Sequence, residues 1–160
     1  MPLTGGIMGS ISASGTRRAA RISGLVALTL LTAAASEPPP TVEVSVTALR
    51  SAKGQILVCL TTNPKAFPDC SKDTTSVRMA VKAADAGNFA VHAPAAGTYA
   101  IAVVHDENSN NKMDTAIFLP KEGFGFSRNP TITVGPPSFK SASFAVAGDM
   151  RQSIKMKYML

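Results

Sequence analysis

Apolar and polar side chains alternate along much of the chain after residue 40. In the run TVEVSVTAL, residues 41–49, three valines fall on one face and polar residues fall on the other. A period of two is typical of a β-strand with one buried face. The same pattern predicts further strands, within residues 55–62, 76–84, 88–95, 95–106, 138–148 and 153–160. The core positions predicted from this alternation are Val42, Val44, Val46, Ile56, Val58, Leu60, Val77, Met79, Val81, Ile154, Met156 and Tyr158.

Turn-forming residues separate these runs. Lys53-Gly54 and the segment DAGN, residues 85–88, stand between predicted strands. No segment after residue 36 has a helical period, and one helical turn within residues 64–73 is the single candidate. The run at 95–106 is almost continuously apolar, so we expect it to be buried on both faces. About seven short strands at close spacing predict an all-β fold, an antiparallel β-sandwich.

The N-terminal residues have the pattern of an export signal. A basic segment precedes the apolar run ISGLVALTLLTAAA, and its arginines are Arg17, Arg18 and Arg21. The run ends in small residues that fit a cleavage site before or close to Ser36. It is shorter than the roughly 20 residues of a membrane span, and an uncleaved anchor is the alternative. We expect a cleaved signal peptide at residues 1–36, one domain at residues 37–160, and a periplasmic or secreted protein without a membrane span.

Charge excludes one class of partner. The net charge of the 160 residues is +6, and it falls to +3 without residues 1–36, which hold three arginines and no acid. The remaining chain has no stripe of Lys and Arg interleaved with aromatic residues, so it has no nucleic-acid-binding pattern. An envelope protein or a glycan is the partner class that fits an exported protein.

Two cysteines, Cys59 and Cys70, lie in the predicted domain. In an exported chain such a pair most simply forms one disulfide. The turn-rich segment between them makes closure easy, and the chain-entropy model gives such a loop about 3 kcal/mol of stabilisation. A pair of thiolate metal ligands is the alternative.

The strand at 95–106 runs directly into HDENSNNKMD, residues 105–114, in which oxygen-bearing side chains recur at alternate positions. The spacing matches an EF-hand calcium loop, where side-chain oxygens at alternate positions and one main-chain carbonyl meet the ion. The candidate ligands are Asp106, Asn108, Asn110, Asp114 and the main-chain carbonyl of Lys112.

Two positions depart from the EF-hand pattern. Asn111 replaces the usual Gly, but Asn tolerates the left-handed backbone that this position needs. Ile117 stands where a bidentate Glu would close the site, and Glu122 or Glu107 could take its place. We therefore expect weak calcium affinity, in the sub-millimolar to millimolar class of extracellular modules.

Two other interpretations of the loop stay open. Asp and Asn side chains cap backbone amides in Asx turns, which need no ion. A catalytic role would need a partner for His105, yet adjacent strand residues such as His105 and Asp106 point to opposite faces. His92 lies on another predicted strand, so we expect both histidines to be structural or surface residues.

The segment GFGFS, residues 123–127, places two aromatic rings between glycines. One interpretation is that the rings fold back and cap the edge of the sandwich. The other is an exposed ligand-binding platform formed by Glu122, Phe124, Phe126 and Arg128.

The second half of the chain resembles a known family. A strand of the form G-x-Y-A is followed by H-D-x-N-x-N and a later Asp, then by P-x-E-G-x-G-F-S and P-x-F-x-x-A-x-F. The positions that match are Gly97, Tyr99, Ala100, His105, Asp106, Asn108, Asn110, Asp114, Pro120, Glu122, Gly123, Gly125, Phe126, Ser127, Pro137, Phe139, Ala142 and Phe144. This pattern resembles the bacterial domain of unknown function 2141. The resemblance implies an immunoglobulin-like or transthyretin (prealbumin)-like sandwich and no established activity.

We expect an exported, non-enzymatic β-sandwich module, stabilised by calcium in the 106–114 loop and acting in binding or interaction at the cell envelope. The alternatives are a structural accessory domain without a ligand and a periplasmic hydrolase.

Overall fold

The computed structural model describes residues 38–116 and 119–160. The predicted signal, residues 1–36, and Ile117 lie outside the described residues. The strands are β1 (Thr41–Thr47), β2 (Gln55–Thr61), β3 (Val77–Lys82), β4 (Phe89–His92), β5 (Gly97–Asp106), β6 (Thr115–Ala116), β7 (Leu119–Pro120), β8 (Gly123–Phe126), β9 (Phe144–Val146) and β10 (Met150–Lys155). Short helical turns are η1 (Cys70–Lys72), η2 (Ala83–Asp85) and α1 (Phe139–Ala142).

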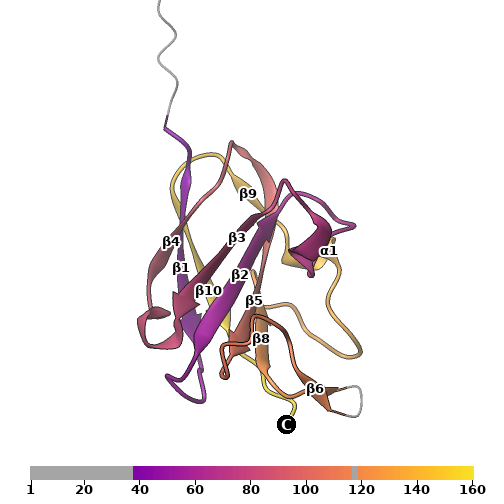
Figure 1. Ribbon diagram of the computed structural model, residues 1–160. Helices are drawn as coiled ribbons and strands as arrows, with labels where there is room; N and C mark the ends of the chain where they lie inside the picture. Colours follow the sequence, from indigo (N-terminus) through magenta and orange to yellow (C-terminus); the bar gives the residue numbers. More distant parts are fainter. Residues whose placement is uncertain (1–37, 117–118) are drawn as a thin grey trace, which may run out of the picture. The chain divides into compact units, whose positions relative to one another are not determined.

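Two sheets pack face to face, as Figure 1 shows. One sheet has the strand order β10-β1-β4, and the other has the order β3-β2-β5-β8. Strand β9 pairs with the first residues of β5, and β6 pairs with β7 in a small separate hairpin. The all-β, sandwich-like fold that the alternation predicts is confirmed.

One strand pair differs from the prediction of an antiparallel sandwich. β1 and β10 run parallel, with a register from Val42 opposite Met150 to Thr47 opposite Lys155. The other named strand pairs are antiparallel. Alternation within one strand carries no information about the direction of a partner more than 100 residues away, so the sequence pattern could not predict this pair.

The core between the sheets follows the predicted alternation. Val42, Val44 and Val46 of β1 face Ile56 and Leu60 of β2, and all five side chains are buried. Ile154 and Met156 are also buried, and Tyr158 packs against the same cluster. Each fully buried aliphatic side chain contributes roughly 1.5–3 kcal/mol of transfer free energy. This cluster is therefore the main stabilising element of the fold.

Strand β8, which the sequence analysis did not predict, explains the alternation of glycine and phenylalanine. Gly125 lies opposite Val103 in the register, and a Cβ there would meet Ile154 Cγ2 at 2.7 Å. Phe124 and Phe126 lie opposite Val104 and Ala102, on the other face of the sheet. There they form a second buried cluster, together with Phe67, Ala100, Ala102 and Ala142. Glycine is required on the inner face because the core leaves no room for a side chain.

The second cluster covers the outer face of β5. As a result, the residues from Tyr99 to Val103 are all buried, which confirms the prediction for this strand. It is the central strand of the larger sheet, with β2 on one side and β8 and β9 on the other.

The predicted strand at 138–148 is partly wrong. Residues Phe139–Ala142 form one helical turn, and only Phe144–Val146 form a strand. Ser138 caps the turn because its hydroxyl accepts a hydrogen bond from the Ser141 N–H, a local contact that alternation does not report. The predicted helical turn within 64–73 is confirmed as η1. Within residues 38–116 and 119–160, no helix has the length and apolar character needed to cross a membrane.

The predicted disulfide joins Cys59 of β2 to Cys70 of η1, with the two Cα atoms 6.0 Å apart. Both cysteines are buried. The bridge fastens the 62–72 segment to the centre of the larger sheet.

Candidate functional site

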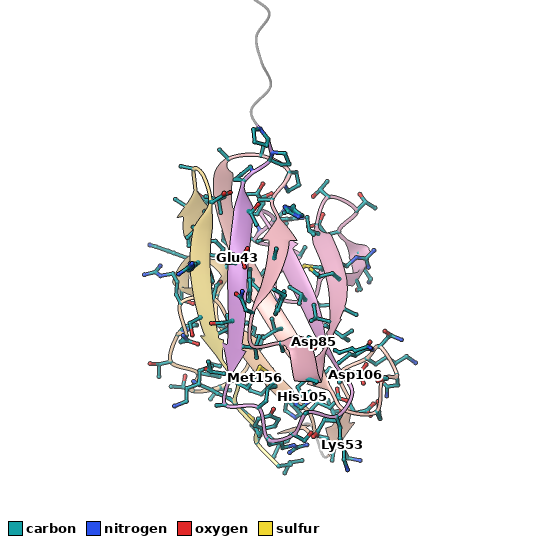
Figure 2. All side chains as sticks on the ribbon, turned by 90° about the vertical axis from the view of Figure 1, so that its left-hand side faces the viewer. Glu43, Lys53, Asp85, His105, Asp106 and Met156 are labelled. Carbon is teal, nitrogen blue, oxygen red and sulfur yellow. A yellow bond between two sulfur atoms is a disulfide. The ribbon has the colours of Figure 1, made fainter. Side chains whose placement is uncertain are left out.

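The candidate metal loop leaves the sheet at the end of β5. Asp106 is the last residue of this strand, and it lies opposite Gln55, the first residue of β2. In Figure 2, Asp106, His105 and Lys53 lie at the same end of the sandwich. Pairing between β2 and β5 therefore fixes where the loop begins.

Asp106 holds the loop through both carboxylate oxygens. Oδ1 accepts a hydrogen bond from the Asn110 N–H (3.0 Å), and Oδ2 accepts bonds from the Asn111 N–H (2.7 Å) and Gln55 Nε2 (2.8 Å). Burial raises the pKa of Asp106, but the hydrogen bonds from Gln55 and the loop amides outweigh it and leave the pKa below its usual value. The carboxylate is therefore an ionised anchor.

The turn that the EF-hand pattern requires is present. Asn111 has a φ of 62°, in the left-handed region, as the sequence analysis predicted. Its side-chain Oδ1 accepts a second bond from Gln55 Nε2 at 3.0 Å. Ser109 has a φ of 57°, so the loop contains two left-handed residues within three positions. This tight curl directs alternate side chains to the same side.

The Asp114 carboxylate accepts hydrogen bonds from the side-chain amides of Asn108 and Asn110. Asn108 Nδ2 donates to Asp114 Oδ2 at 2.7 Å, and Asn110 Nδ2 lies 3.0 and 3.1 Å from the two Asp114 oxygens. Asn108 Oδ1 caps the Asn110 N–H, and Asn110 Oδ1 caps the N–H of Lys112, whose side chain is exposed. Four of the predicted ligands thus belong to one hydrogen-bonded ring.

Glu122 approaches this ring from the corner between β7 and β8. Its side chain is only 4% exposed, and its Oε2 accepts a hydrogen bond from the Asp114 N–H at 3.2 Å. Its other oxygen, Oε1, is buried and has no hydrogen-bond partner among the described residues. Burial raises the pKa of Glu122, and the negative charges of Asp106 and Asp114 raise it further. The Lys121 N–H donates to the Asp114 carbonyl at 2.9 Å, which fastens the corner to the loop.

Glu107, the other acid considered as a substitute ligand, is already engaged. Arg50 Nε donates to Glu107 Oε2 at 2.9 Å, and Ser51 Oγ donates to Oε1 at 2.7 Å. The Arg50 guanidinium also lies 4.6 Å from the centre of the Tyr158 ring. The hydrogen bond from Arg50 lowers the pKa of Glu107. These contacts make Glu107 part of the support around the loop.

His105 has a packing role at this end of the sandwich. It is fully buried, with Nε2 2.8 Å from the Lys53 carbonyl and Nδ1 2.7 Å from the Tyr158 hydroxyl. Because a carbonyl can only accept, Nε2 donates in the first contact. The second histidine, His92, is exposed and lies 3.2 Å from Thr41 Oγ1.

The prediction of an exposed aromatic platform is wrong. Phe124 and Phe126 are 5% and 6% exposed, and Glu122 is buried as well. Phe67 covers the Phe126 ring in an edge-to-face contact at 5.7 Å. Arg128 is exposed, and its Nη1 donates to the Ser143 carbonyl at 3.1 Å. The alternative interpretation, in which the rings pack onto the sandwich, describes this segment.

The donor atoms of the loop have the chemistry that calcium prefers, namely carboxylate, amide and main-chain oxygens. In the described ranges, 38–116 and 119–160, no three His, Cys, Asp or Glu side chains already converge to metal-binding distance. An ion would therefore have to draw Asp106, Asp114 and any third acid closer together.

Gln55 and Arg50 are the contributors to this site that the sequence analysis missed. They precede the loop by more than 50 residues, and only the pairing of β2 with β5 brings them to it. A polar residue at the start of a strand that pairs with β5 is the signal that could have identified Gln55.

No curated protein and no solved structure matches the chain. A family model does match it over residues 44–155, a region that contains the whole candidate loop and both sheets except for the first three residues of β1. The model describes an uncharacterised protein conserved in bacteria, the domain of unknown function 2141, and the chain belongs to this family.

Proposed function

We propose that this protein is an exported, non-enzymatic β-sandwich module that acts in binding or interaction at the cell envelope and binds a calcium ion in the 106–114 loop. One observation carries the calcium assignment: Asp106, Asn108, Asn110 and Asp114 form a single connected ring at EF-hand spacing. The tight curl at Asn111 supports it, because that curl turns alternate side chains inward.

Asx turns and ion binding are compatible in this loop. Each side-chain carbonyl oxygen of Asn108 and Asn110 has two lone pairs, and capping one backbone amide uses only one of them. The asparagine Nδ2 groups donate to Asp114, which marks the centre of negative charge. A cation bound at Asp114 displaces these charge-assisted hydrogen bonds and is coordinated by the carboxylate directly.

A location outside the cytoplasm is consistent with the weak calcium affinity expected of this site. The signal pattern in residues 1–36 and the disulfide between Cys59 and Cys70 both suit an oxidising compartment outside the cytoplasm. Extracellular calcium modules work at about 10⁻⁴–10⁻³ M. Affinity of that order is sufficient where the free calcium concentration is high.

Thermal unfolding with calcium or with chelator tests the proposal. At a calcium concentration roughly ten times a Kd of about 0.5 mM, linkage predicts about 1.4 kcal/mol of stabilisation, which corresponds to roughly 5 °C in Tm for a domain of this size. Asp114→Asn should remove most of that shift, because it removes a loop carboxylate. The matched control, Asp149→Asn, changes an exposed carboxylate that contacts the first residue of β1 and should keep the full shift.

An unchanged Tm at several millimolar calcium would overturn the proposal and leave a structural domain held by Asx turns. Magnesium at the same concentration separates specific binding from general screening of charge. Only the specific case gives a larger shift with calcium than with magnesium.

A further inference from the structure

The unpaired oxygen of Glu122 lies deep in the protein. Buried polar atoms nearly always have a hydrogen-bond partner, because leaving one unpaired costs its full desolvation free energy. Glu122 Oε1 is the only fully buried side-chain nitrogen or oxygen that lacks such a partner in residues 38–116 and 119–160. This exception coincides with the candidate metal loop, so it needs a local explanation.

Glu122 is positioned toward the ring of Asp106 and Asp114. Its Oε2 accepts a hydrogen bond from the Asp114 N–H at 3.2 Å. The only ion pair among the described residues joins Arg50 to Glu107, so none of these three carboxylates is in one.

The position of Glu122 also matches what the loop lacks. An EF-hand site is closed by a Glu from the end of the loop, and here that position is Ile117. Glu107 is held by Arg50 and Ser51, whereas Glu122 has a free oxygen. Glu122 follows the small β6–β7 hairpin, which returns the chain to the loop through the Lys121–Asp114 hydrogen bond.

We propose that Glu122 Oε1 is the closing ligand of a two-segment calcium site, in which it joins Asp106, Asn108, Asn110, Asp114 and the Lys112 carbonyl. This inference rests on the proposed function, because it names the missing ligand of the same ion. Six protein oxygens fall within the six to eight that calcium takes. Magnesium binds less well because it demands compact octahedral geometry and holds its waters.

In the two-segment site, the ion has a structural role. Asp106 ends β5 and Glu122 precedes β8, and these two strands are neighbours in the larger sheet. An ion bound by both acids ties the loop after β5 to the first residues of β8. It also neutralises a cluster that is repulsive without it.

Calcium titration of the purified protein and two matched variants tests the inference. Glu122→Gln keeps the size of the side chain and should weaken calcium affinity by about tenfold or more, which is the usual effect of losing a ligand or its immediate support. Its Tm in chelator should equal or exceed that of the wild type, because an unpaired buried acid has been removed. Glu43→Gln makes the same substitution on β1, in the other sheet, without removing a ligand or a support of the loop, so its affinity should stay within about twofold of the wild type.

The outcomes separate the two proposals. Absence of calcium binding by the wild-type protein overturns the proposed function and this inference together. Binding by the wild type with equal affinities for Glu122→Gln and Glu43→Gln overturns only the assignment of Glu122. Binding by the wild type with selective loss in Glu122→Gln supports both.

A second measurement distinguishes direct coordination of the ion by Glu122 from an electrostatic effect of its charge at a distance. The luminescence lifetime of europium(III) in light and heavy water counts the water molecules on an ion bound at a calcium site. In Glu122→Leu, which has no side-chain oxygen to offer, the count should rise by about one if Glu122 is monodentate and by about two if it is bidentate. An unchanged count would show that Glu122 acts only through its charge, which contradicts the assignment.

Discussion

At two places in this domain, a single carboxylate holds an irregular backbone segment by accepting hydrogen bonds from it. Asp106 binds the amides of the loop after β5, and Asp73 does the same for the segment after η1. Asp73 Oδ1 accepts bonds from the Thr75 N–H (3.0 Å) and hydroxyl (2.6 Å), and Oδ2 accepts one from the Thr61 hydroxyl (2.7 Å). A buried turn with satisfied amides needs no ion, so Asp73 is an internal comparison for the candidate metal loop.

The hydrogen bonds from Thr75 and Thr61 lower the pKa of Asp73 from its ordinary value of 3.8. Its ionised form therefore stabilises the folded state above pH 3.8, and this contribution is lost as pH falls through the lower, folded-state pKa. We predict that Asp73→Asn unfolds more easily than the wild type at neutral pH. The difference should shrink from about pH 5 down to about pH 2.

Urea unfolding across this pH range measures the difference in the free energy of unfolding. The exposed Asp85→Asn variant is the control, since it should match the wild type throughout. A wild-type advantage over Asp73→Asn that is the same at every pH would contradict the prediction.

At the scale of elements, β8 shows how close packing selects residue types on each face of a strand. Gly125 faces Ile154, Val103 and the main-chain oxygen of Lys155, whereas Phe124 and Phe126 fill the outer cluster. The backbone of β8 can approach β10 only because its inner positions lack a Cβ. The second cluster, and the burial of β5 on both faces, depend on that approach.

Gly125→Ala should therefore destabilise the domain by about 1–3 kcal/mol, the usual cost of overpacking a filled core. The added Cβ would lie 2.7 Å from Ile154 Cγ2, so the core or the strand must shift. Gly148→Ala is the matched control, because nothing lies within 4 Å of a Cβ there. Denaturant unfolding of the two variants gives the comparison, and equal stabilities would show that β8 is not closely packed.

These elements also show how far the sequence predicts the fold. Alternation identified β1 and β2 because a buried face recurs along each, and a nearly continuous apolar run identified β5, which is buried on both faces. It missed β8 because glycine on the inner face hides the apolar alternation. It placed a strand at 139–142 because it cannot detect the Ser138 cap, and it could not predict the parallel β1–β10 pair.

The same distinction applies to the candidate site: some of its features can be predicted from the sequence, and others cannot. Spacing alone places Asp106, Asn108, Asn110 and Asp114 in one ring, because they lie within nine residues of one another. The contacts of Gln55 and the unpaired oxygen of Glu122 depend on which strands pair and what is buried. Local chemistry is therefore visible in the sequence, whereas the surroundings that complete it are not.

At the scale of the whole molecule, two separate interactions connect irregular segments to the larger sheet. The disulfide holds the 62–72 segment to the middle of β2 through Cys59, and the loop contacts hold the end of β5 to Gln55 at the start of β2. Cys59 and Gln55 are separated by about 13 Å along the strand, at about 3.3 Å per residue. Contributions from sites this far apart, with no shared partner, usually add.

Replacing both cysteines with alanine should lower the free energy of unfolding by about 3–4 kcal/mol, because the unfolded chain regains the entropy of the closed loop and small cavities form. Any stabilisation that calcium adds should stay the same within about 0.5 kcal/mol, since the substitutions leave the end of β2 that contacts the candidate loop unaffected. Thermal unfolding of both proteins, with calcium and with chelator, measures the two effects and their sum. Reduction of the wild-type protein with a thiol reagent provides the same comparison without a substitution. Loss of the calcium effect in the alanine variant would contradict this prediction. It would show that the disulfide and the loop contacts act as one cooperative unit, so that the loop forms only when the disulfide stabilises the sheet.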